Sequence, residues 1–149
     1  MVAPAGSGKT EALRAVAARK GCPVVNLSLE LSRRLLDVST RQRPIRASSI
    51  VDDIVRGYPG DVVVVDNLEL LFAPELELDP LRMLKHLGRD RTVIAAWPGT
   101  IDGSHLRYAE PGHPEARDYP VQGTEIVNAG TSEGAGHDAS PEPFHQERK

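Results

Sequence analysis

The feature that most constrains this chain is a glycine-rich segment close to its N-terminus. Residues 3–10 read Ala-Pro-Ala-Gly-Ser-Gly-Lys-Thr and match the phosphate-loop (P-loop) pattern G-x-x-x-x-G-K-[ST], except that Ala3 occupies the first glycine position. Such a loop joins the carboxyl end of a buried strand to the N-terminus of a helix. The segment therefore predicts a strand–loop–helix unit rather than an all-α or all-β fold.

The residue types in this loop suit the binding of nucleotide phosphates. Glycines let backbone N–H groups approach a phosphate closely, and the N-terminus of the following helix adds partial positive charge. We expect Lys9 to neutralise β- and γ-phosphate oxygens and the Thr10 hydroxyl to coordinate Mg²⁺. The predicted phosphate-binding residues are Ala5, Gly6, Ser7, Gly8, Lys9 and Thr10. The alternative is a chance sequence in a flexible loop, which the helix pattern directly behind it disfavours.

Apolar periodicity predicts that strands alternate with helices along the chain. A capping box at Ser49 and Asp52 is expected to open one helix, and Asp102-Gly103 is expected to form a hairpin turn. The four consecutive valines of 62–65 indicate a strand buried on both faces. The predicted helices are 10–20, 28–38, 49–56 and 80–87, and the predicted strands are 23–27, 61–66, 91–97 and 105–109.

This alternation predicts an α/β protein, specifically a P-loop NTPase three-layer sandwich with a mostly parallel sheet. Only Met1 and Val2 precede the loop, so most of the first strand is missing, and we expect that strand to begin upstream of Met1. Residues 1–120 are predicted to form the nucleotide-binding domain. Residues 121–149 are rich in Gly, Ser, Glu and Pro and are predicted to be a disordered polar tail.

Asp66 is also predicted to be a functional residue, because it lies at the end of the valine strand. P-loop proteins place an acid there to hold the magnesium, so Asp66 joins Thr10 as a predicted metal ligand and Lys9 as a predicted catalytic residue. Many ATPases follow this acid with Glu, whereas this chain has Asn67, which cannot accept a proton from water. Glu69 is the nearest candidate base, although it also suits the start of a helix. Turnover is therefore expected to be slow.

The composition restricts the function classes and the cellular compartment that we expect for the protein. The net charge of -3 argues against a general nucleic-acid coat protein, and the single cysteine, Cys22, excludes an internal disulfide. Neither a signal peptide nor a membrane-length apolar run is present, so we expect a cytoplasmic protein. Arg33, Arg34, Arg41, Arg43 and Arg46 form a basic group that is either a solvated surface or a contact with nucleic acid, a neighbouring subunit or an acidic partner.

The chain resembles the BrxF family, the small P-loop proteins of type 3 BREX phage-defence systems. The P-loop alone identifies only a very large superfamily, and more particular matches carry the resemblance, which covers roughly residues 2–120. These matches are 26–36 (NLSLELSRRLL), 41–44 (RQRP), 65–72 (VDNLELLF), 78–82 (LDPLR), 96–99 (AWPG) and 108–115 (YAEPGHPE). The resemblance implies that Asp66-Asn67 is the usual form of this site.

The same resemblance implies an ATP-binding accessory protein that works with other BREX proteins, with ATP and Mg²⁺ as cofactors. We therefore predict a slow or partner-stimulated ATPase or switch. Self-association and DNA contact stay open, and no membrane contact is expected. One alternative is an assembly scaffold that binds nucleotide without hydrolysing it, which Asn67 favours. A less favoured alternative is a small-molecule kinase that uses the arginines of 41–46 as a lid.

Overall fold

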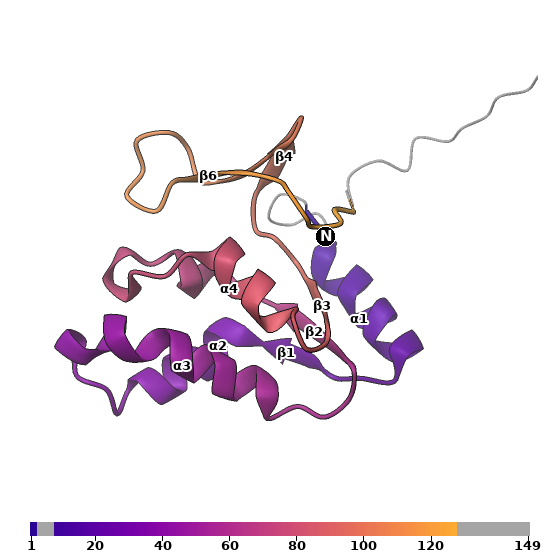
Figure 1. The fold of residues 1–149 in the computed structure, drawn as a ribbon, viewed down its shortest axis with the longest axis horizontal. Coiled ribbons are helices and arrows are strands. Elements are labelled where there is room, and N and C mark those ends of the chain that lie inside the picture. The colour runs from indigo at the N-terminus through magenta and orange to yellow at the C-terminus, as the bar shows by residue number, and fades with distance from the viewer. Residues whose placement is uncertain (3–7, 128–149) are drawn as a thin grey trace, which may run out of the picture.

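The computed structural model describes residues 1–2 and 8–127, which form two sheets and the helices that cover the first of them (Figure 1). The α-helices are α1 (Lys9–Lys20), α2 (Leu27–Leu35), α3 (Arg43–Arg56) and α4 (Pro80–Leu87). The strands are β1 (Val24–Asn26), β2 (Val62–Asp66), β3 (Thr92–Ala95), β4 (Thr100–Asp102), β5 (His105–Tyr108) and β6 (Arg117–Pro120). Short 3-10 helices are η1 (Thr40–Gln42), η2 (Glu69–Phe72) and η3 (Pro74–Leu76).

The first sheet is parallel, with strand order β1-β2-β3. Val24 to Asn26 pair with Val64 to Asp66, and Val62 to Val65 pair with Thr92 to Ala95. Two crossovers, β1 to β2 and β2 to β3, run in the same direction across the sheet. Right-handed crossovers of this kind place their helices on the same face. The predicted α/β class with a parallel sheet is therefore confirmed for the described residues.

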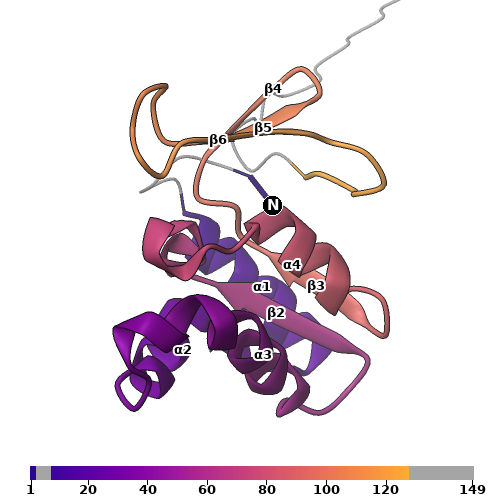
Figure 2. The same cartoon turned by 60° about the vertical axis from the view of Figure 1, so that its left-hand side comes forward.

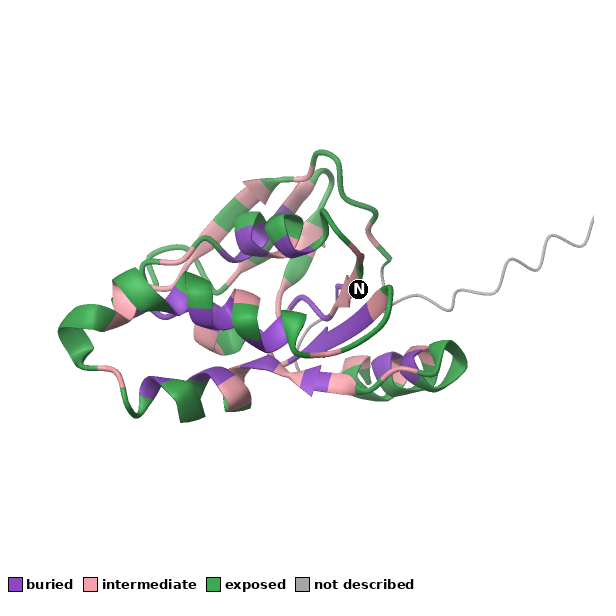
Figure 3. Cartoon of the chain, turned by 60° about the horizontal axis from the view of Figure 1, so that its bottom comes forward, coloured by how far each residue is buried: buried purple, intermediate pink, exposed green. Residues whose placement is uncertain are grey.

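The valine strand β2 is buried on both faces, as its sequence predicts. Val64 packs with Leu13 and Ala17 of α1 and with Ala96, forming one small cluster. Val63 and Val65 belong instead to the main core, which also takes side chains from α2, α3 and α4. Figure 3 shows buried residues along the strands and on the inward sides of the helices. Helix α1 thus covers one face of the sheet, opposite the larger group of helices.

The position of the predicted first strand is taken by the two residues at the N-terminus. Val2 forms a parallel bridge with Trp97, beyond the end of β3. The Met1 ammonium donates to Ala95 O at 2.8 Å, and Trp97 N donates to Met1 O at 2.7 Å. Val2 is itself buried. The segment that enters the loop therefore lies beside β3, so that β3 separates it from β2.

A second, antiparallel sheet of order β4-β5-β6 follows the first and lies apart from it (Figure 2). The predicted hairpin turn is confirmed, because Asp102 pairs with His105 and Gly103 has φ of 56°. Strand β6 was not predicted, since its sequence alternates only weakly between apolar and polar residues. Its Tyr119 contacts Trp97 edge-on, with ring centroids 5.9 Å apart. This contact ties the second sheet to the end of β3.

Two helix boundaries differ from the sequence prediction. Helix α3 begins at Arg43 rather than after Ser49, so the capping box is wrong; the Ser49 hydroxyl instead donates to Arg46 O at 2.9 Å. Pro44 fits the first turn of a helix, where no N–H partner is needed. Helix α2 begins at Leu27, one residue early, because the Asn26 side chain caps it by accepting from Leu29 N at 3.1 Å. It ends at Leu35 rather than Val38.

The segment after β6 remains in contact with the rest of the protein over its described part. Val121 N donates to Ser104 O at 2.7 Å, and Val2 N donates to Val127 O at 3.0 Å. Residues 128–149, which make up most of the predicted tail, lie outside the described residues, so the tail stays a prediction. No helix in the described part of the chain has both the length and the apolar character needed to span a bilayer.

All three tyrosines are expected to ionise late in the folded protein. A hydrogen bond to Glu30 raises the pKa of Tyr58, burial raises the pKa of Tyr108, and burial raises the pKa of Tyr119 to about 12. A raised pKa means that the folded state holds the proton longer than the unfolded state does. The contribution of Tyr119 is therefore complete below its ordinary pKa of 10.0 and is lost as pH rises toward 12.

Spectrophotometric titration should show tyrosinate absorbance in the folded protein only above the range seen in denaturant. Tyr119→Phe should lower the amplitude of the latest transition and weaken the alkaline loss of stability. A folded protein in which all tyrosines titrate as they do in denaturant would contradict this assignment.

Candidate functional site

The candidate site lies where the parallel strands of the first sheet end. Asn26 ends β1 and Asp66 ends β2, and the sheet register places these two residues opposite each other. Trp97 follows β3 at the same edge, and α1 begins nearby, since Lys9 of its first turn reaches Trp97. Ligands of open parallel sheets bind at this carboxyl edge.

Lys9 is the first residue of α1 and points across the end of β3. Its Nζ donates to Trp97 O at 3.3 Å. Burial lowers the pKa of Lys9, and the negative charges of Glu69 and Asp66 partly offset that effect. Carboxylates that face a partly desolvated ammonium favour its charged form and interact with it more strongly than they would in open water. The structure thus brings together the three predicted catalytic residues, Lys9, Asp66 and Glu69.

Asp66 is buried, with 6% of its surface exposed, and no other charged residue of the described segments is buried. One of its carboxylate oxygens, Oδ1, accepts a hydrogen bond from Asn67 N at 2.9 Å. Burial of an ionised carboxylate is costly unless it has hydrogen bonds or a cation nearby. Its position at the end of an apolar strand is therefore difficult to explain by folding alone, and it is typical of a functional acid.

Asn67, directly after this acid, adopts a left-handed backbone conformation with φ of 55°. Ser28 of α2 holds it there, because both Ser28 N and Ser28 Oγ donate to Asn67 O, at 3.0 and 2.5 Å. Ser28 Oγ also accepts from Leu70 N at 3.0 Å. The start of α2 therefore fixes the loop after β2, and strained residues held in this way are common at functional sites.

Glu69 and Thr10 occupy the rim of the site. Glu69 is exposed and is the first residue of η2, so it also serves as the helix-starting acid that its sequence position suggests. Thr10 is exposed in the first turn of α1. Gly8 precedes α1 with φ of 79°, a conformation that suits glycine at the end of a phosphate loop. Ala5, Gly6 and Ser7 lie outside the described residues, and their predicted contacts stay predictions.

An open groove of about 630 Å³ continues from this edge along α2, η2 and η3. The second sheet closes one side of it with Tyr108 and Glu115, whose Tyr108 Oη–Glu115 Oε2 hydrogen bond measures 3.4 Å. Stacking of Tyr108 on Phe72, with centroids 3.7 Å apart, holds that side in place. The groove and the carboxyl edge share Asn26, Asn67 and Glu69. A ligand bound in the groove can therefore affect a ligand bound at the carboxyl edge.

No protein-family model, no curated protein and no solved structure matches this chain. The site is therefore interpreted from its own residues.

No group of three or more His, Cys, Asp or Glu side chains in the described segments is placed to hold a metal ion. Magnesium bound together with a nucleotide does not need such a group, because phosphate oxygens and water supply most of its ligands. One buried carboxylate and one hydroxyl, as in Asp66 and Thr10, are the protein ligands that such a site uses. The residues present fit Mg²⁺ only as the partner of a nucleotide.

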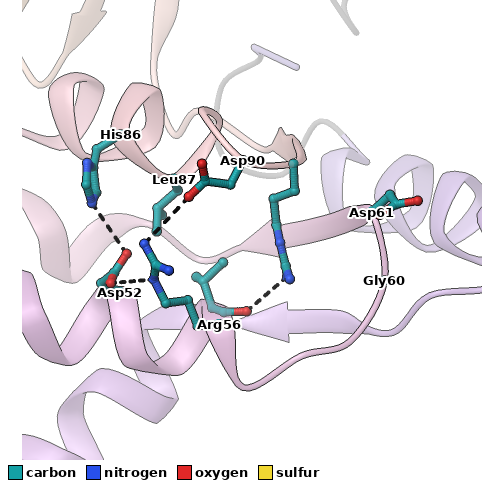
Figure 4. A pocket seen from close by; sticks show the side chains of 9 residues that line it. Asp52, Arg56, Gly60, Asp61, His86, Leu87 and Asp90 are labelled. Carbon is teal, nitrogen blue, oxygen red and sulfur yellow. Dashed lines mark hydrogen bonds and ion pairs between the residues drawn. The ribbon is translucent and has the colours of Figure 1, made fainter.

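A smaller cavity of about 130 Å³ lies at the opposite end of β2, between α3 and α4 (Figure 4). Several of its polar side chains contact one another. Arg56 contacts Asp52 at 2.6 Å and Asp90 at 3.7 Å, and His86 contacts Asp52 at 3.4 Å. Arg91 donates to Val55 O and to Tyr58 O. We interpret this cavity as a structural junction between the two helices.

Sequence reasoning did not identify Asn26, Ser28 and Tyr108 as part of this region. Asn26 carried a usable signal, because it is a polar residue at the end of an apolar strand, as Asp66 is. Ser28 and Tyr108 carried none, since their places depend on how α2 and the second sheet pack. The five arginines of 33–46 do not reach the site within this chain; they lie at the far end of α2, in η1 and at the start of α3.

Proposed function

We propose that this chain binds ATP with Mg²⁺ through a P-loop and acts as a slow or partner-stimulated ATPase or switch. Its fold would then be a P-loop NTPase sandwich whose first strand is the segment beside β3. Lys9 and the backbone of residues 5–10 would hold the phosphates, and Thr10 and Asp66 would hold the magnesium.

The observation that supports this proposal most is the meeting of two separate sequence motifs. Lys9, from the glycine-rich segment, lies close enough to Asp66, at the end of the valine strand, for the negative charge of Asp66 to raise the pKa of Lys9. The two residues are far apart in sequence, and the packing of α1 against Val64 of β2 brings their elements together. A lysine at a helix N-terminus facing a buried carboxylate is the arrangement that Mg²⁺ and a triphosphate together would bridge.

A non-hydrolysing scaffold is the second candidate, and the geometry of Asn67 favours it. Asn67 stands where a catalytic glutamate often follows the acid. Its backbone carbonyl oxygen accepts a hydrogen bond from Ser28 Oγ. Glu69 is the only predicted base, and it lies exposed at the rim. Release of phosphate from ATP by the purified chain, alone and with candidate partners, separates the two. No release under any condition favours the scaffold.

The resemblance to BrxF proteins supplies the proposed setting, an accessory role in a BREX-type anti-phage system in the bacterial cytoplasm. A small nucleotide-binding domain without an evident substrate pocket needs partners to make use of the nucleotide state. Co-purification with the other proteins of such a system, with and without ATP, tests this part separately from nucleotide binding.

Asp66→Asn is expected to remove the magnesium dependence of nucleotide binding. The amide keeps the shape and can still accept from Asn67 N, so the fold should be retained, but the neutral oxygen is a poor ligand for Mg²⁺. We expect wild type to bind a fluorescent ATP analogue at least about tenfold more tightly with Mg²⁺ than with EDTA, and Asp66→Asn to show little difference. Asp61→Asn, at the exposed opposite end of β2, is the matched control. Equal magnesium dependence in wild type and Asp66→Asn would contradict the assignment.

A further inference from the structure

The end of α2 and the start of α3 expose large apolar side chains beside arginines. Leu36 is 81% exposed and Ile45 is 78% exposed, the two highest values among the exposed large hydrophobic residues of the described chain. Exposed apolar side chains rimmed by polar or charged residues can mark a contact with another protein. We name this surface the arginine tip; it comprises the exposed residues Arg33, Arg34, Leu36, Arg41, Ile45 and Arg46, whose four arginines outnumber the exposed Asp37 between them.

The groove described above has the opposite charge and a complementary apolar floor. We name it the acidic groove; its carboxylates are Glu69, Glu75 and Glu115, and its apolar residues are Leu29, Leu70, Ala73 and Tyr108. Leu29 is 44% exposed there. Glu75 and Glu115 form no salt bridge with a lysine or arginine of the described chain, and the charge of Glu69 acts on Lys9 through space. A cationic, partly apolar partner would satisfy both parts of the groove.

We propose that the arginine tip of one chain docks into the acidic groove of a second copy. Tip and groove match in charge and both carry apolar side chains, which is the composition expected of a contact between surfaces. Within one chain the tip and the groove use different parts of α2. Leu29 of the groove and Leu36 of the tip lie about 10 Å apart along the helix axis at 1.5 Å per residue.

Docking of the tip into the groove does not require bound nucleotide. Because Asn67 and Glu69 line both the groove and the candidate site, docking would place a second chain beside the nucleotide edge. Association is therefore tested on the full chain without nucleotide, so that failure of the proposed function and failure of this inference are distinguishable.

Sedimentation velocity over a range of concentrations tests the contact. Wild type should self-associate with a Kd no weaker than about 100 µM. The tip variant Arg41→Glu/Arg46→Glu and the groove variant Glu75→Arg should each weaken association by at least about tenfold, and the chain carrying all three changes should recover most of the loss. Leu36→Ser/Ile45→Ser should also weaken it, without changing the melting temperature, because both side chains are exposed.

The matched controls are Arg89→Glu and Glu125→Arg, exposed charges outside both surfaces, which should leave association unchanged. A wild-type chain that remains monomeric overturns the proposal. So does an oligomer that all the tip and groove variants retain, because association would then use another surface. Weakening by both single-surface variants without recovery in the combined chain also overturns the direct pairing of tip and groove.

Discussion

Replacement of Lys9 by alanine is expected to weaken binding of Mg²⁺ and ATP by about a hundredfold, the effect of losing two charge-assisted hydrogen bonds to phosphate. Lys9 lies at the N-terminus of α1 and already faces Asp66 and Glu69. Without its ammonium, the buried carboxylate and the incoming phosphates would repel each other. Isothermal titration calorimetry with ATP and Mg²⁺ measures the loss directly.

Lys20→Ala is the matched control, because Lys20 is exposed at the other end of the same helix. It should bind nucleotide as wild type does. Thermal melts of both variants should stay close to wild type, because Lys9 is only partly buried at the start of α1. If Lys9→Ala binds as tightly as Lys20→Ala while both are folded, the glycine-rich segment is not a nucleotide site.

Gly99→Ala is expected to be the most destabilising small substitution in the described chain. A Cβ at this position would lie 1.8 Å from Arg107 O, a backbone atom that accepts from Trp97 Nε1 at 3.0 Å. The strands β4 and β5 must therefore separate, or the tryptophan must lose its hydrogen bond. We expect a loss of about 3 kcal/mol in the free energy of unfolding, at the upper end of overpacking effects.

Urea denaturation measures this loss, and Gly88→Ala provides its control. Gly88 ends α4 with a negative φ, and the nearest atom to an added Cβ is Leu84 O at an ordinary contact distance of 3.4 Å. Its substitution should change stability by less than about 1 kcal/mol. Gly99 lies between β3 and β4 and so joins the two sheets. Gly99→Ala should therefore also loosen the groove wall formed by Tyr108. Equal stabilities for the two variants would show that β4 and β5 do not approach as described.

The local sequence determined those secondary-structure elements whose conformation depends on residues within or next to the element. Four consecutive valines predict β2 because a strand buried on both faces needs no alternation. Asp79 and Pro80 predict the start of α4, where the Asp79 side chain accepts from Arg82 N at 2.9 Å. Gly21, at φ of 67°, ends α1 as expected. In each case the deciding interaction lies within a few residues of the element.

Local sequence patterns gave wrong predictions where contacts with residues distant in sequence decided the secondary structure. Ser49 and Asp52 have the spacing of a capping box, yet α3 begins at Arg43, because Ala47 is fully buried on the same inward face as Ile50 and Val51. Burial of that additional turn stabilises the helix more than a surface cap would. Strand β6 likewise exists because β5 supplies its hydrogen bonds, not because its sequence favours a strand.

The candidate site divides in the same way. The sequence by itself predicted its chemistry, because Lys9, Thr10 and Asp66 follow from motifs whose residue types have few substitutes. Only the tertiary structure decided that Lys9 and Asp66 meet, that Ser28 holds Asn67 in its left-handed conformation, and that Tyr108 closes the groove. These placements depend on strand order and sheet packing, since parallel strands bring residues distant in sequence to one edge while adjacent residues point to opposite faces.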